Sequence, residues 1–281
     1  MSCCRFDREG SRLGLHKVKM LKILISNDDG VEAAGLQILF NCIKEIAEVF
    51  VIAPSENKSG SGSSISTRRG LLAKRNKNGF LYVNGTPVDC VHLGLNGLCP
   101  FKPDLVLAGI NYGANLAEDL VYSGTVAAAF EGRDLPLPCI SISAAAFNQP
   151  GTANSGKKPN FRSAALVTKN IIQNIVKLNL NSNITLNVNV PNLPYEDIEE
   201  ISITTLGSWG KRNPPTKDIS SKGEEIFWVT HRSKIPNNSR GSDISALTRG
   251  AVSITPIYPN FLSLEKTKDL SNWAIKYLKN D

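Results

Sequence analysis

The stretch Leu21-Lys-Ile-Leu-Ile-Ser-Asn-Asp-Asp-Gly30 determines the fold class of this chain. Its first six residues form a short apolar run typical of a buried β-strand, and the run ends at polar residues and a glycine. Apolar residues then recur at helical spacing over residues 35–46, and Val49-Phe-Val-Ile-Ala53 follows as a second buried strand. Strand, helix and strand within about 35 residues indicate a βαβ unit, with parallel strands and a right-handed crossover.

The alternation of strand and helix patterns continues beyond this unit. Three further buried strands are expected, at residues 104–110, 139–143 and 184–190. Two helices are expected between them, from Thr125 to Arg133 and from Phe161 to Leu178. Such alternation predicts an α/β fold with a mostly parallel sheet.

The last third of the chain has a different character. Three strand-like pieces occur there, at residues 201–206, 225–230 and 251–257, and polar, proline-rich stretches separate them. We therefore expect a β-rich C-terminal extension on a single domain that spans residues 20–281. Within it, residues 207–245 are expected to form an oligomerisation arm that leaves the core and pairs with another subunit.

The composition excludes several classes of protein. The chain has 281 residues, 41% of them hydrophobic, but no run of about 18 apolar residues that could span a membrane. The formal net charge of +7 comes from 32 Lys and Arg against 25 Asp and Glu, without a long basic run. We therefore expect neither a membrane nor a nucleic-acid polymer as a partner.

The N-terminal segment and the cysteines indicate the compartment. Residues 1–19 lack the apolar segment of a secretory signal and are expected to be a disordered extension. The six cysteines contain no CxxC pair and match no zinc-site spacing. They are interpreted as reduced thiols, so a cytoplasmic location is expected.

Two adjacent carboxylates, Asp28 and Asp29, follow the first strand. Ligands bind at the carboxyl ends of the strands in open α/β sheets. Neighbouring carboxylates repel one another unless a cation neutralises them, and a hard divalent ion prefers oxygen ligands. The alternative is that the two residues form an acidic cap at a helix N-terminus. Taken alone, the Asp28-Asp29 pair favours this cap over a metal site.

Three more polar positions are expected at the same edge of the sheet. Ser59 lies in a Ser/Gly-rich loop after the second strand, Asn111 follows the strand at 104–110, and Ser123-Gly-Thr125 precedes a helix. Hydroxyls, an amide oxygen and free N–H groups there suit a cation and a phosphate. Each position also has a simpler interpretation when taken alone: a surface loop for Ser59, a turn for Asn111 and a helix N-cap for Ser123-Gly-Thr125. Their shared location favours a metal-plus-phosphate site.

Two common kinds of site find little support. The chain has 3 histidines, too few to favour a His-based metal site or a Ser-His-Asp triad. The first strand is not followed by G-x-G-x-x-G, which argues against a dinucleotide cofactor.

Taken together, the motifs resemble the SurE family of stationary-phase survival proteins. The resemblance extends in order from Met20 to about residue 260, and it is carried by Ile23–Gly30, Val51–Ser55 with Ser59-Gly60, Asn84–Val91, Gly109–Asn111 with Gly113–Leu116, Tyr122–Val126 and Gly250–Ile257. It implies a Rossmann-like three-layer core and a homodimer or homotetramer built by exchange of the C-terminal extension.

The resemblance also implies an activity and a set of site residues. Relatives are metal-dependent phosphomonoesterases of the 5'-nucleotidase type, which hydrolyse nucleoside 5'- and 3'-monophosphates. One divalent cation, Mg²⁺ or Mn²⁺, is implied at Asp28, Asp29, Ser59 and Asn111. Asp28 and Asp29 are the implied catalytic residues. The phosphate is implied near Asn115, Ser123, Gly124 and Thr125.

Two other functions fit the same residues. One is a regulatory module that binds a nucleotide or another anion without turnover. The other is a hydrolase of polyphosphate or of another phosphoester. The base, the position of the phosphate on the sugar and the size of the oligomer stay open.

Overall fold

The computed structural model describes residues 20–146, 158–178, 180, 183–211, 213–229, 239–258 and 271. The expected N-terminal extension, residues 1–19, lies outside the described residues.

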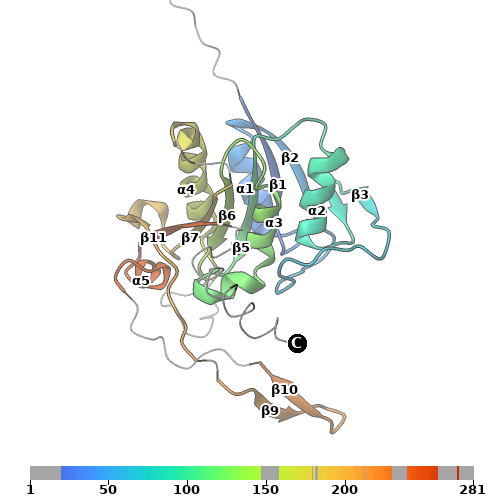
Figure 1. Cartoon of the computed structure of the whole chain (residues 1–281), viewed down its shortest axis with the longest axis vertical. Helices are drawn as coiled ribbons and strands as arrows, with labels where there is room; N and C mark the ends of the chain where they lie inside the picture. The colour runs from blue at the N-terminus through green and yellow to red at the C-terminus, as the bar shows by residue number, and fades with distance from the viewer. Residues whose placement is uncertain are drawn as a thin grey trace, which may run out of the picture.

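A nine-stranded sheet forms the centre of the molecule, in the order β3-β4-β2-β1-β5-β6-β7-β11-β8 (Figure 1). Its strands are β1 (Leu21–Ser26), β2 (Ala47–Pro54), β3 (Ala73–Arg75), β4 (Leu81–Val83), β5 (Leu105–Tyr112), β6 (Cys139–Ala144), β7 (Thr185–Val190), β8 (Ile201–Ile203) and β11 (Val252–Ile257). The central strands from β4 to β7 are parallel, whereas β3 and β11 run antiparallel to β4 and β7 respectively.

Helices cover the sheet in two groups. The α-helices are α1 (Ala34–Ile43), α2 (Pro87–Leu93), α3 (Gly124–Glu131), α4 (Phe161–Asn174) and α5 (Asp243–Thr248). Short turns of other helical types are η1 (Gly94–Leu98), η2 (Ala117–Tyr122), η3 (Ile175–Lys177) and η4 (Tyr195–Asp197). Helix α1 packs with α4, and α2 packs with α3, so the sheet has a helical layer on each face. The predicted three-layer α/β fold with a mostly parallel sheet is confirmed.

The chain path places a topological switch point between β1 and β5. After β1 the chain crosses through α1 to β2 on one side, and it later returns to β5 on the other side of β1. Ligands of doubly wound sheets bind at this kind of switch point, beyond the carboxyl ends of the strands. Asp28 and Asn111 both lie at this edge.

The core forms because β1 and its neighbours are apolar on both faces. Ile23, Leu24 and Ile25 are fully buried, as parallel strands between two helical layers require. Gly35 allows α1 to approach β5 closely, since a β-carbon there would lie 2.2 Å from the Ile110 carbonyl oxygen. The contact between these two elements therefore depends on the absence of a side chain.

The C-terminal part confirms the expected strands and adds two elements. The pieces expected at 201–206, 225–230 and 251–257 form β8, β10 (Glu225–Trp228) and β11. The stretches interpreted as polar excursions also contain β9 (Thr216–Ile219) and α5. β9 was missed because all four of its residues are exposed, so it has no alternating apolar pattern.

β9 and β10 pair as an antiparallel hairpin that projects away from the main sheet (Figure 1). None of the helices in the described parts of the chain is long and apolar enough to cross a membrane.

Candidate metal and phosphate site

The paired carboxylates lie on a tight turn directly after β1. Asn27 closes this turn, because its side-chain amide donates to the Gly30 carbonyl at 2.9 Å and its Oδ1 accepts from the Gly30 N–H at 3.2 Å. Gly30 has a φ of +100°, and a β-carbon there would lie 3.1 Å from the Glu56 backbone. A glycine at this position lets the turn pack against the loop that follows β2.

Asp28 is almost completely buried, with 3% of its surface exposed. Its Oδ1 accepts a hydrogen bond of 2.5 Å from the Thr125 hydroxyl in the first turn of α3. Burial raises the pKa of the Asp28 carboxyl above its ordinary value, and the Thr125 hydrogen bond opposes that rise. The predicted neighbours Asp28 and Thr125, far apart in the sequence, are therefore in direct contact.

Asp29 is linked to β5. Its Oδ2 accepts from the backbone N–H of Tyr112 at 2.9 Å, and Tyr112 directly follows Asn111. Burial raises the pKa of Asp29 to about 6, and the nearby charge of Asp28 adds to this rise. Within the described chain, neither carboxylate has an ion pair with Lys, Arg or His. Two close acidic groups without a cationic side chain suit a metal ion.

Gly124 and Ser61 complete the wall beside Asp28. A β-carbon at Gly124 would lie 2.9 Å from Asp28 Cβ and 3.0 Å from the Ser61 hydroxyl oxygen. That hydroxyl oxygen is buried and has no hydrogen-bond partner among the described residues. A buried hydroxyl without a partner is costly, so it points to a ligand beside Asp28. Sequence analysis missed Ser61, because one serine in a Ser/Gly-rich loop carries no directional signal.

The loop after β2, residues 55–66, contacts the site through its backbone. The Lys58 N–H donates to the Asp28 carbonyl at 2.7 Å, and the Gly62 N–H donates to the Tyr122 carbonyl at 3.2 Å. Ser59 is exposed, and its own N–H donates to Asn57 Oδ1 at 2.8 Å. The structure therefore brings the backbone next to Ser59 against Asp28, without a direct contact between their side chains.

Asn111 lies within β5, which extends to Tyr112 and so runs slightly further than expected. Its side-chain N–H donates to the Gly113 carbonyl at 2.8 Å. This bond orients the amide and leaves Oδ1 as the atom that suits a cation.

The predicted phosphate residues divide into two groups. Gly124 and Thr125 begin α3 and touch Asp28, whereas the Ser123 hydroxyl accepts from the Val126 N–H at 3.1 Å and caps the helix. The N-cap interpretation of Ser123 is thus confirmed. The backbone N–H groups in the first turn of α3 are the groups that suit an anion.

Asn115 belongs to a polar cluster at the ends of β6 and β7, and among the described residues its hydrogen bonds go to this cluster rather than to the carboxylates. Its N–H donates to Asn189 Oδ1 and its side chain donates to the Ser143 hydroxyl, both at 2.8 Å. Asn187 and Asn189, both fully buried, donate in turn to the Asn115 carbonyl. Sequence analysis interpreted these two residues only as part of an alternating strand.

The available donors decide what kind of ion fits. No group of three or more His, Cys, Asp or Glu side chains comes together in the described parts of the chain. The site instead offers two carboxylates with hydroxyl and amide oxygens. Oxygen ligands of this kind fit Mg²⁺ or Mn²⁺ rather than zinc.

The fold and the site define a doubly wound α/β protein with paired carboxylates beside a helix N-terminus, at the switch point of its sheet. The family model described as "Survival protein SurE" matches residues 23–213. The chain belongs to the SurE family.

Individual relatives agree with this assignment over nearly their whole length. The chain is 41% identical to a protein of Nitrosococcus oceani named 5'-nucleotidase SurE, over 90% of this chain and 97% of the relative. A protein of Pseudomonas putida with the same name is 42% identical, over 90% and 98%. The crystal structure of the SurE protein from Aquifex aeolicus has a TM-score of 0.77 and 35% identity, covering 92% of this chain and all of that one.

Proposed function

We propose that this chain is a metal-dependent 5'-nucleotidase, which hydrolyses nucleoside 5'-monophosphates, and 3'-monophosphates as well, to nucleoside and phosphate. The observation that carries the proposal is the Asp28–Asp29 pair, which has no cationic side-chain partner among the described residues and is bonded through Thr125 to the N-terminus of α3. The names of the relatives in Nitrosococcus oceani and Pseudomonas putida support the same activity.

One divalent cation, Mg²⁺ or Mn²⁺, is proposed at this site. Asp28, Asp29, Ser59 and Asn111 would hold it. The chemistry that it supplies when bound is polarisation of the phosphoryl group and a lower pKa of a coordinated water.

The residues of the chain have separate roles in this proposal. The Thr125 hydroxyl holds the Asp28 carboxylate in one orientation through the 2.5 Å hydrogen bond. The Tyr112 N–H does the same for Asp29. One of the two carboxylates orients the attacking water, and the backbone N–H groups at the start of α3 bind the phosphoryl oxygens. Asn115, whose carbonyl accepts from Asn187 and Asn189, would also contact the phosphate.

The experiment that tests this function measures phosphate release from a panel of nucleoside monophosphates, with Mg²⁺, Mn²⁺ or EDTA. Asp28→Asn is expected to lower the metal-dependent rate by at least about a hundredfold while the circular dichroism stays native, because it removes a charged ligand. Asp134→Asn, an exposed carboxylate elsewhere, is the matched control.

The outcomes separate the candidate functions. Full activity of Asp28→Asn would contradict the assigned site. Metal-dependent nucleotide binding without phosphate release from any substrate would favour the regulatory module. Release from polyphosphate but not from nucleotides would favour the other phosphoester hydrolase.

We also propose a homodimer or homotetramer in the cytoplasm, with residues 207–245 as the oligomerisation arm. The β9–β10 hairpin exposes large apolar side chains, among them Ile219, Phe227, Trp228 and Val229. Apolar groups on a projecting hairpin are expected to be covered by a second copy of the chain.

A further inference from the structure

The loop at residues 55–66, here called the site loop, places the Ser61 hydroxyl in the wall beside Asp28 and contains Ser59, a proposed ligand of the cation. Nothing in its composition fixes its course, since it is rich in Ser and Gly. Contacts outside the loop must therefore hold the two serines in place.

The first half of the site loop is held by the site itself. Lys58 donates to the Asp28 carbonyl, and Gly62 donates to the Tyr122 carbonyl just before α3. Ser64 then turns the chain back, since its hydroxyl donates to the Ser61 carbonyl at 2.8 Å.

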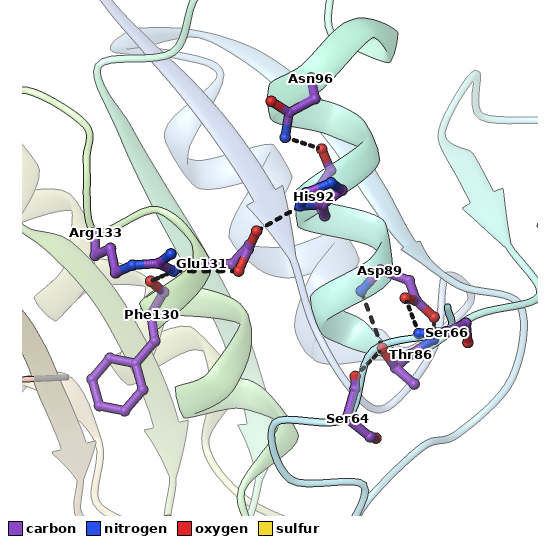
Figure 2. Close-up of polar contacts among 9 residues, drawn as sticks. All are labelled: Ser64, Ser66, Thr86, Asp89, His92, Asn96, Phe130, Glu131 and Arg133. Carbon is purple, nitrogen blue, oxygen red and sulfur yellow. Dashed lines mark hydrogen bonds and ion pairs between the residues drawn. The ribbon is translucent and has the colours of Figure 1, made fainter. Parts of the chain in front are cut away.

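The second half is held by the first turn of α2, as Figure 2 shows. The N–H of Ser66 donates to Asp89 Oδ1 at 2.8 Å, and the Thr86 hydroxyl donates to the Ser64 carbonyl at 2.7 Å. Asp89 Oδ2 accepts from the Thr86 N–H at 2.9 Å, and the Asp89 N–H donates to the Thr86 hydroxyl at 3.1 Å.

These contacts exceed what the cap of α2 requires. A capping box needs one oxygen of Asp89 and the hydroxyl of Thr86. The second carboxylate oxygen of Asp89 and the hydroxyl proton of Thr86 instead bond the backbone of the site loop, at Ser66 and Ser64 respectively. Asp89 is 2% exposed, and although burial raises its pKa, the hydrogen bonds from Ser66 and Thr86 outweigh this and lower it. Its hydrogen bonds are therefore charge-assisted.

We propose that Asp89 is a positioning residue, whose carboxylate together with the Thr86 hydroxyl clamps the site loop and so fixes Ser61 beside Asp28 and the backbone around Ser59. The clamp itself is independent of the reaction. Its effect on a bound cation rests on the proposed function.

Trypsin cleavage tests the clamp directly, because Lys58, Arg68 and Arg69 lie in or just beyond the site loop. Asp89→Asn is expected to raise the cleavage rate at these three sites about tenfold in the native protein, as loss of a charge-assisted hydrogen bond implies. His92→Ala is the matched control, since His92 lies on the same helix and bonds Glu131 rather than the loop. Equal cleavage of the two variants would overturn the clamp.

Thr86 provides a second pair of variants, in which one change removes the hydroxyl and the conservative change keeps it. Thr86→Val loses the hydroxyl and is expected to expose the same cleavage sites, whereas Thr86→Ser keeps the hydroxyl and is expected to restore protection. Cleavage of Thr86→Ser as fast as Thr86→Val would contradict the clamp.

Binding of Mn²⁺ alone, measured by calorimetry without substrate, tests the effect on the site. Asp89→Asn and Thr86→Val are expected to weaken Mn²⁺ binding about 3- to 10-fold, and Thr86→Ser and His92→Ala to leave it unchanged. If trypsin cleaves the site loop of Asp89→Asn and Thr86→Val faster but both variants bind Mn²⁺ as tightly as the unmodified protein, the positioning role of Asp89 is overturned. If the unmodified protein binds no Mn²⁺, the proposed function fails, while the clamp is still decided by trypsin.

Discussion

The environment of Asp28 and Asp29 is built by several elements of the fold, because the two carboxylates bond residues of α3 and β5. Their place at the end of the first strand is evident from the sequence, because a buried strand must end where polar residues begin. Their partners are not evident, since Thr125 and Tyr112 are some 80–100 residues away and contact the carboxylates only once the sheet has formed. Ser61 was missed for the same reason: its burial depends on how close Gly124 comes to it.

The raised pKa of Asp29 has a consequence for stability in EDTA. Its folded value of about 6 exceeds the unfolded value of 3.8, so the folded state binds this proton more tightly. The free energy of unfolding is therefore expected to rise by about 1 kcal/mol as the pH falls from about 7.5 to about 5. Urea denaturation at the two pH values measures it.

Two comparisons make this prediction specific to Asp29. Asp29→Asn removes the titrating group, so its unfolding free energy is expected to lack this part of the pH dependence. Saturating Mg²⁺ holds the carboxylate ionised and is expected to reduce the gain as well. The same pH slope in the Asn variant and in the unmodified protein would count against the shifted pKa.

At the scale of elements, regular strands and helices were predictable and special contacts were not. The βαβ unit was found because apolar periodicity is strong in buried parallel strands. Helix α5 was missed because it has only six residues, and β9 because its residues are all exposed. Asn187 and Asn189 fit the expected strand, but only the three-dimensional neighbourhood shows that both bind Asn115.

The close approach of α1 to β5 gives a prediction for Gly35. Gly35→Ala would place a β-carbon 2.2 Å from the Ile110 carbonyl oxygen and 3.2 Å from the Phe161 ring, so the elements must separate. We expect a loss of about 1–3 kcal/mol in the free energy of unfolding, measured in urea. Gly70→Ala, where no atom lies within 4 Å, is the control and is expected to change stability little. Equal stability of both variants would contradict the close approach.

At the scale of the whole molecule, the sequence predicted an α/β core of alternating strands and helices and a polar excursion from it, and the structure shows how the described parts of both are arranged. The main sheet contains the candidate site between β1 and β5, whereas the β9–β10 hairpin stands apart from it (Figure 1). The proposed catalytic site and the proposed assembly contact therefore lie on separate parts of the molecule.

Assembly is expected to depend on the apolar side chains of the hairpin. Phe227→Ser should weaken self-association about 10- to 100-fold, because a buried large side chain contributes about 1.5–3 kcal/mol. Light scattering behind size exclusion, over a dilution series, measures the shift toward monomer. Lys222→Ala, at the hairpin turn, is the control. If Phe227→Ser has the same molecular mass as the unmodified protein at every dilution, the hairpin is not the contact between subunits.

The position of β1 in the sheet also affects how the chain folds as it is made. Ile23, Leu24 and Ile25 pair with β2, which begins about 20 residues after β1 ends, and with β5, which begins about 80 residues after it. At about 5–20 residues per second, a ribosome needs roughly 4–16 seconds to produce that strand. During this interval the edge of β1 that later pairs with β5 has unpaired backbone N–H and C=O groups, beside apolar side chains that are not yet covered. Slow translation between residues 54 and 105 should therefore favour aggregation of the nascent chain or its capture by a chaperone.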